Sequence, residues 1–271
     1  MVDAVVSIEG AEPWSASGAG ERARTGVVVL HGFTGNPNST RPLGQRLAAE
    51  GYRVEVPRLP GHGTDVRDLG RTRYTDWVDA AESVVEQVAA TTDHLVLVGL
   101  SLGGTLTLDI TSRRTDLVDG AVVINPQILN PVQLLAKLAP VLQFVAPYVP
   151  RDLAGLPSDD IARPTADERA YGKVSAKAAQ SIMRELPRVR RQLPQLTQPL
   201  LVAYSPQDHS VPCGNAQALR ELIGRADAPI TELVLPRSYH VATLDYDAPL
   251  LEAETVRFVG EIAATSASPA S

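Results

Sequence analysis

The sequence predicts an α/β protein in which a mostly parallel, doubly wound sheet is interrupted by an inserted helical cap. Short β-branched runs alternate with segments of helical periodicity, a pattern typical of a parallel sheet with helices on both faces. The chain has 271 residues and is 44 % hydrophobic, enough for one core of this class. A proline-rich stretch over residues 126–196 breaks the alternation, because plain connections between such elements are much shorter.

Six segments have the composition of strands that are buried on both faces. Each is a short apolar run that ends in turn or polar residues. These segments are residues 27–30, 52–56, 95–99, 121–125, 200–204 and 231–235. They predict a core made of residues 25–125 and 197–262, with the cap inserted between the two parts.

Two helices are predicted between the early strands. Pro42 falls in the first turn of one, and Gly51 falls where a left-handed C-terminal residue belongs. The other begins at Thr75 or Asp76, and apolar residues follow at helical spacing: Trp77, Val78, Ala81, Val84, Val85 and Val88. We expect both helices to pack on the sheet as scaffold.

The ends of the chain are expected to lie outside this core. Residues 1–24 are predicted to be a weakly ordered start, and residues 263–271 a disordered tail rich in Ala, Ser and Pro. No basic, apolar leader is present at the start, and no segment approaches the roughly 18 apolar residues of a membrane span. Cys213 is the single cysteine, so no intrachain disulfide can form. These features predict a cytoplasmic protein without stable membrane insertion.

Charge and motif content exclude several classes of function. A formal net charge of -6, from 25 basic and 31 acidic residues, provides no basic surface for nucleic acid. The sequence contains neither a G-x-x-x-x-G-K phosphate loop nor an H-E-x-x-H zinc motif. We therefore expect a small-molecule substrate, no nucleic-acid partner, no metal and no cofactor.

Residues 99–103, Gly-Leu-Ser-Leu-Gly, form the strongest motif in the chain. They follow the apolar run 95–98 and precede a helical pattern, so Ser101 lies where a strand turns sharply into a helix. The flanking glycines permit the tight, strained backbone of such a turn. This context predicts an α/β-hydrolase fold with Ser101 as its nucleophile. The Leu102 N–H then points toward the oxyanion.

A nucleophilic serine needs a base, and the base needs an acid that orients it. In this fold the acid and then the histidine follow the serine, which leaves His209 and His240 among five histidines. His240 is the better candidate because its loop follows the last predicted strand. Asp208, at the carboxyl end of a strand, is the predicted acid. Asp245 and Asp247 are its rivals, and we interpret both as structural loop residues.

The segment 31–35, His-Gly-Phe-Thr-Gly, closes the first strong strand. Its glycines let the backbone approach a ligand, so the Phe33 N–H is the predicted second oxyanion donor and Phe33 a substrate contact. His31 and His62 both lie beside glycines and are expected to be structural. In the cap, an apolar helical stripe faces either the sheet or a pocket. Three of its members are candidate substrate contacts: Leu135, Leu138 and Leu142.

Four motifs in this order resemble those of bacterial carboxylesterases of the monoacylglycerol lipase type. They are Leu30-His31-Gly32-Phe33-Thr34-Gly35-Asn36, Gly61-His62-Gly63, Gly99-Leu100-Ser101-Leu102-Gly103-Gly104, and His240-Val241-Ala242-Thr243-Leu244-Asp245. The resemblance implies a triad of Ser101, Asp208 and His240, with oxyanion donors at Phe33 and Leu102. It also implies hydrolysis of medium-chain monoacylglycerols and simple carboxylic esters through an acyl-enzyme, an acyl channel formed by the cap, and no cofactor.

Two alternatives stay open at this point. The same triad can transfer an acyl group to an acceptor other than water, or cleave a thioester or an amide, because the cap governs access to the site. A hydrolase-fold protein that has lost catalysis can also act as a ligand-binding protein. Dehalogenase chemistry is excluded, since it needs a carboxylate where Ser101 stands.

Overall fold

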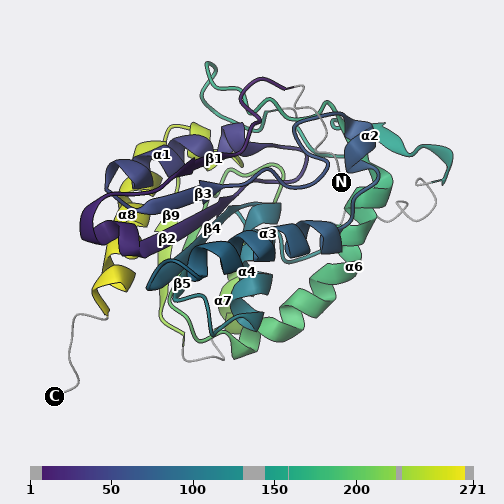
Figure 1. The fold of residues 1–271 in the computed structure, drawn as a ribbon. Coiled ribbons are helices and arrows are strands. Elements are labelled where there is room, and N and C mark those ends of the chain that lie inside the picture. Colours follow the sequence, from purple (N-terminus) through teal and green to yellow (C-terminus); the bar gives the residue numbers. More distant parts are fainter. Residues whose placement is uncertain (1–7, 131–143, 158, 224–227, 266–271) are drawn as a thin grey trace.

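The computed structural model describes residues 8–130, 144–157, 159–223 and 228–265. Its centre is a seven-stranded sheet with the order β1-β3-β2-β4-β5-β8-β9, parallel throughout except at β1 (Figure 1). The strands are β1 (Trp14–Ala16), β2 (Thr25–Leu30), β3 (Arg53–Val56), β4 (His94–Leu100), β5 (Gly120–Ile124), β8 (Leu200–Tyr204) and β9 (Ile230–Val234). All six predicted strands are present, and the predicted α/β fold class is confirmed.

Helices cover both faces of the sheet (Figure 1). One face carries α1 (Arg41–Ala49) and α8 (Ala248–Ala264), and the other carries α3 (Tyr74–Ala89), α4 (Leu102–Arg113) and α7 (Gly214–Ile223). Successive side chains of a strand point to opposite faces. Val28 and Leu30 accordingly pack with α3 and α4, whereas Val27 and Val29 pack with α1 and α8. Burial on both faces is the physical reason for the unbroken apolar runs in the sequence.

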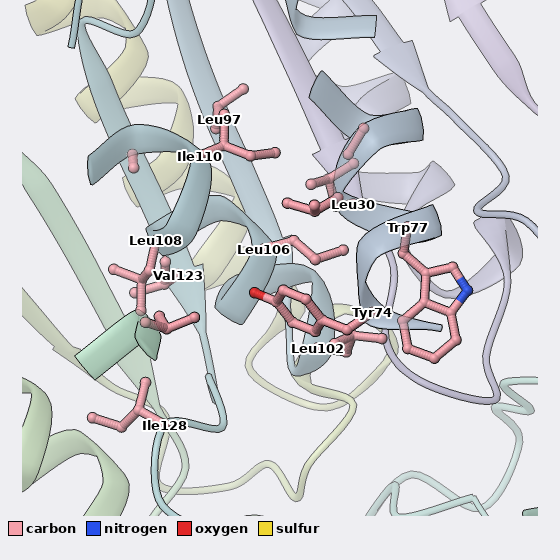
Figure 2. Close-up of a cluster of buried hydrophobic side chains, with 14 of the residues drawn as sticks. Leu30, Tyr74, Trp77, Leu97, Leu102, Leu106, Leu108, Ile110, Val123 and Ile128 are labelled. Atoms are coloured by element: carbon pink, nitrogen blue, oxygen red, sulfur yellow. The ribbon is translucent and has the colours of Figure 1, made fainter. Parts of the chain in front are cut away.

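The helix that follows Ser101 lies within the larger core cluster. Every residue of α4 from Leu102 to Thr111 is buried. Figure 2 shows Leu102 and Leu106 of this helix beside Tyr74 and Trp77 of α3. Close packing on all sides fixes the start of α4, and with it the strand-to-helix turn, relative to the sheet.

The start of the chain differs from the prediction. Residues 14–16 form β1, which pairs antiparallel with β3 and places Trp14 opposite Val56. A short 3-10 helix (Gly20–Arg24) then leads into β2. Residues 14–24 are therefore an ordered edge of the core and not a weakly ordered start, because β1 satisfies the free hydrogen-bonding edge of β3.

The described part of the insertion contains one long helix and a small ribbon. The ribbon pairs β6 (Tyr148–Pro150) with β7 (Lys173–Ser175) antiparallel, and α6 (Ala176–Gln192) follows directly. Ser175 caps α6 by accepting a hydrogen bond from the Ala178 N–H. Short helices also occur at α2 (Val66–Leu69) and in 3-10 turns at 37–39, 193–195 and 242–244. None of the helices in the described ranges is long and apolar enough to cross a membrane.

Candidate active site

Ser101 occupies the sharp turn between β4 and α4. Its φ of 55° and ψ of -117° lie in a region that non-glycine residues rarely adopt. The Ser101 N–H donates to the Ile124 carbonyl of β5 at 2.9 Å, which holds the turn against the sheet. A Cβ on Gly99 would lie 2.2 Å from the Gly103 carbonyl oxygen, and one on Gly103 would lie 2.2 Å from the Leu30 carbonyl oxygen. The turn thus requires glycine at both flanks.

The two predicted oxyanion donors, Leu102 and Phe33, belong to segments next to Ser101. Leu102 is the first residue of α4, where a backbone N–H has no partner within the helix. The loop with Gly32 and Phe33 passes close to Ser101, since a Cβ on Gly32 would lie 3.3 Å from the Ser101 Cβ and 3.8 Å from its Oγ. Glycine at 32 therefore leaves room at the serine, and Phe33 lines the same cavity as Ser101.

The predicted acid and base meet directly. The His240 Nδ1–H donates to Asp208 Oδ2 at 2.7 Å. The other oxygen of Asp208 accepts from the N–H groups of Ser210 at 2.8 Å and Val211 at 2.7 Å. With 1 % of its side chain exposed, Asp208 is a buried carboxylate whose hydrogen-bonding capacity is met by protein groups.

Asn125, the residue after β5, joins the two loops that carry this pair. Its amide Nδ2 donates to the His240 carbonyl at 2.8 Å, and its Oδ1 accepts from the Ser205 N–H at 2.8 Å. Asn125 adopts a φ of 46°, which asparagine tolerates better than most residues. One side chain therefore aligns the acid loop with the base loop.

The pKa of His240 is raised above its ordinary value. Burial acts to lower the pKa, but the negative charge and hydrogen bond of Asp208 outweigh it, and Glu168 and Asp160 add further negative charge. This environment stabilises the imidazolium that a general base forms when it accepts a proton.

The rival residues form other contacts. The His209 Nδ1–H donates to Asp160, not to Asp208, at 2.7 Å. Asp245 and Asp247 accept hydrogen bonds from backbone N–H groups of their own loop, as expected for structural residues. His31 donates from Nδ1 to the Gly32 carbonyl and accepts from the Leu59 N–H, and burial lowers its pKa to about 4. Such a histidine is a structural group.

Ser101 and His240 line one cavity of about 130 Å³, most of whose wall is apolar. The insertion supplies much of that wall from β6, β7, α6 and the loops beside them: Val149, Ala154, Leu156, Val174, Ala176, Ala179, Ile182 and Met183. The candidate contacts Leu135, Leu138 and Leu142 lie outside the described residues. Ala179, Ile182 and Met183 follow helical spacing, so an apolar pattern in the sequence could have indicated the part of the wall that α6 forms.

Two charged residues of the insertion also line the cavity, and the sequence analysis missed both. Glu168 is buried, and burial raises the pKa of its carboxyl group. The Nη2 atom of Arg151 lies 3.9 Å from Oε2 of Glu168, and its Nη1 donates to the Thr34 hydroxyl at 2.9 Å. Neither residue belongs to a motif, so no local signal indicated them. Among the described residues, no group of three or more His, Cys, Asp or Glu side chains is placed to hold a metal ion.

Comparison with known proteins identifies the family of the chain. Residues 21–247 match the family described as Hydrolase_4, serine aminopeptidase S33. The chain belongs to this family. It is 35 % identical over 251 residues to a thermostable monoacylglycerol lipase of a Bacillus species, covering 93 % of this chain and 95 % of the relative. It is 24 % identical to a carboxylesterase of Bacillus subtilis, over 87 % of this chain and 92 % of that protein.

Solved structures share the fold of this chain. A structure from work on the metagenome-derived lipolytic enzymes LipS and LipT superimposes with a TM-score of 0.84 at 30 % identity, covering 94 % of this chain and 99 % of that one. The monoacylglycerol lipase of Paleococcus ferrophilus superimposes with a TM-score of 0.74 at 21 % identity, over 93 % of this chain and 99 % of that one. The predicted α/β-hydrolase fold and family resemblance are confirmed, and the chain is a serine hydrolase.

Proposed function

We propose that this hydrolase cleaves carboxylic esters, in particular short- to medium-chain acyl esters and monoacylglycerols, through an acyl-enzyme on Ser101. The observation that carries the proposal is the 2.7 Å hydrogen bond between His240 and Asp208, with His240 lining the same cavity as Ser101. Relatives named monoacylglycerol lipase and carboxylesterase support this substrate class.

The proposed reaction has two halves. His240, whose Nδ1–H is held by Asp208, uses Nε2 to accept the Ser101 proton as Oγ attacks the ester carbonyl. The N–H groups of Phe33 and Leu102 stabilise the oxyanion, and the alcohol leaves with the proton from His240. Water then attacks the acyl-enzyme, again losing its proton to His240. The bond to Oγ breaks, the carboxylic acid leaves, and Ser101 regains its proton.

The cavity suggests how the substrate binds. The wall formed by β6, β7 and α6 is apolar and suits an acyl chain. Glu168 and Arg151 form a polar patch in this wall, and buried polar groups of this kind favour a substrate that carries hydroxyls over a simple ester. We assign the residues 126–196 to a cap that covers the site. A cytoplasmic location is also part of the proposal, based on the single cysteine.

Replacement of Ser101 by Ala tests the mechanism. We expect hydrolysis of p-nitrophenyl butanoate and of 1-decanoylglycerol to fall by roughly 10⁴-fold or more, because loss of one triad member removes the covalent route. Ser83→Ala on the outer face of α3 serves as the matched control and should retain wild-type rates. An unchanged rate in the Ser101→Ala variant would contradict the proposal.

Transfer to another acceptor and cleavage of thioesters or amides are the competing activities of the same site. The amide alternative has one specific support, the serine aminopeptidase description of the family. Product analysis with an ester, a thioester and an aminoacyl amide, with and without an alcohol acceptor, separates them. We expect free acid from the ester as the dominant product. No turnover and no covalent labelling of Ser101 would instead favour a binding protein that has lost catalysis.

A further inference from the structure

Residues 160–163 of the insertion, here named the cap strap, lie between the two loops that carry Asp208 and His240. The acid loop follows β8, and the base loop follows β9. Asp160 is 3 % exposed, and neither it nor any other cap-strap residue lines the cavity that holds Ser101. The cap strap therefore touches the loops of the site without lining its cavity.

The Asp160 carboxylate binds the acid loop next to Asp208. Its Oδ2 accepts from the His209 N–H at 3.1 Å and from the Ser210 hydroxyl at 3.0 Å, and its Oδ1 accepts from the His209 ring at 2.7 Å. The Ser210 N–H in turn donates to Asp208 at 2.8 Å. Asp160 thus binds the same turn whose backbone N–H groups donate hydrogen bonds to Asp208.

The cap strap also binds the part of the base loop that follows His240. The carbonyl of Asp160 accepts from the Val241 N–H at 3.1 Å. The fully buried Asp245 carboxylate accepts from four N–H groups, two in its own loop and two in the cap strap. These donors are Tyr239 at 2.8 Å, Tyr246 at 2.7 Å, Ala162 at 2.7 Å and Arg163 at 3.0 Å.

We propose that Asp160 and Asp245 are positioning residues that join the acid loop, the base loop and the cap strap into one hydrogen-bonded unit and thereby fix His240 relative to Ser101. The inference rests on the proposed function of the triad. It gives the insertion a part in catalysis beyond enclosing the substrate. The cap strap forms hydrogen bonds with the residues that directly follow Asp208 and His240 in the chain.

Asparagine is the informative replacement for Asp245, and alanine is the informative replacement for Asp160. An ionised carboxylate accepts hydrogen bonds on both oxygens, whereas an amide places an NH₂ group where one of those oxygens stood. In Asp245→Asn the NH₂ group would face two N–H donors. In Asp160→Asn the His209 ring can accept from the NH₂ group by changing its tautomer, so alanine is used there because it removes all three bonds from the Asp160 side chain to the acid loop. A buried donor without an acceptor destabilises the local arrangement, so the loops shift to satisfy it.

Asp109 in α4 offers a matched control. It is also a buried carboxylate that joins the insertion to the core, since it accepts from Arg188 of α6 at 2.9 and 2.7 Å and from Tyr74 at 3.0 Å. It contacts neither the acid loop nor the base loop in these bonds. Asp109→Asn therefore weakens a cap-to-core tie at a different place.

The test compares kcat, KM and the rate of Ser101 phosphonylation by a fluorophosphonate in Asp160→Ala, Asp245→Asn and Asp109→Asn. A misplaced catalytic group can cost up to about a hundredfold, so we expect kcat and phosphonylation to fall roughly tenfold to a hundredfold in the first two variants. Their KM should stay within about twofold because neither residue lines the cavity. Asp109→Asn should lower the melting temperature and retain wild-type kcat below it.

Unchanged kcat in Asp160→Ala and Asp245→Asn, or an equal loss in Asp109→Asn, would overturn the inference. If either variant fails to fold, His209→Ala replaces it, since it removes the ring hydrogen bond to Asp160 and His209 does not line the cavity. Its phosphonylation rate should fall by a smaller factor. Failure of the proposed function gives a different result, because the wild-type chain would then not be labelled at Ser101 at all.

Discussion

His240 and Asp208 are 32 residues apart in the chain, and the His240 Nδ1 atom lies 2.7 Å from Asp208 Oδ2. The two loops meet because β8 and β9 are parallel neighbours whose carboxyl ends share one edge of the sheet. The same edge carries the turn at Ser101, since β4 and β5 run in the same direction. Parallel pairing thus brings distant residues to one cavity.

Asp208→Asn tests the part of this pair that orients the base. An asparagine at 208 can still donate to or accept from His240, but it favours the wrong tautomer, so we expect kcat to fall by roughly 10⁴-fold. The measurement is kcat for a p-nitrophenyl ester at neutral pH. Asp119→Asn, a partly exposed carboxylate that accepts from the Leu95 N–H, is the control and should retain activity. A loss below tenfold in Asp208→Asn would indicate another acid.

The pH dependence of kcat/KM tests the environment of His240. Only the neutral imidazole accepts a proton, so activity is present above the pKa of His240 and is lost as the pH falls through it. Because that pKa is raised, the acid limb of the profile, where kcat/KM falls as the pH is lowered, should be centred above about pH 6.5. Glu168→Gln removes a nearby negative charge and should move the limb to lower pH, whereas Glu221→Gln, on α7, should leave it in place. A limb that moves upward in Glu168→Gln would contradict this account.

Gly103→Ala tests the packing of the turn. The added Cβ would lie 2.2 Å from the Leu30 carbonyl oxygen, so either α4 or β2 must move. We expect the free energy of unfolding to fall by about 3 kcal/mol and esterase activity to fall with it. Gly172→Ala is the matched control, because its added Cβ meets no atom within 4 Å. Chemical denaturation of both variants gives the comparison, and equal stability would show that the turn accommodates a side chain.

Ala179→Phe tests the acyl side of the cavity. Ala179 lies on α6 and lines the wall that the insertion supplies. A phenyl ring there should fill the space of a longer chain, so kcat/KM for decanoyl esters should fall at least about tenfold relative to butanoyl esters. Equal losses for both chain lengths would indicate that this wall does not bind the acyl chain.

The sheet could be predicted because strands buried on both faces are continuous apolar runs. The edge strand β1 could not, since residues 14–16 are three in number, partly exposed and without periodicity. The three-residue strands β6 and β7 escaped prediction for the same reason. Their pairing depends on partners elsewhere in the chain, which a local pattern does not contain.

The residues of the candidate site also fall into those that local sequence patterns could predict and those that they could not. Ser101 was predictable because its turn demands glycines at fixed spacing, and Asp208 and His240 because each follows a strand of the parallel sheet. Glu168, Arg151 and Asp160 were not predictable. They lie in or beside irregular segments of the insertion, and only the tertiary fold brings them to the cavity or its loops.

The central claim is that Ser101 is the nucleophile, and mass spectrometry after treatment with a fluorophosphonate tests it most directly. We predict one covalent adduct per folded chain, located at Ser101 in the proteolytic peptide map, and none in the Ser101→Ala variant. An adduct that persists in Ser101→Ala, or an unlabelled Ser101 in the folded wild-type chain, would contradict the account.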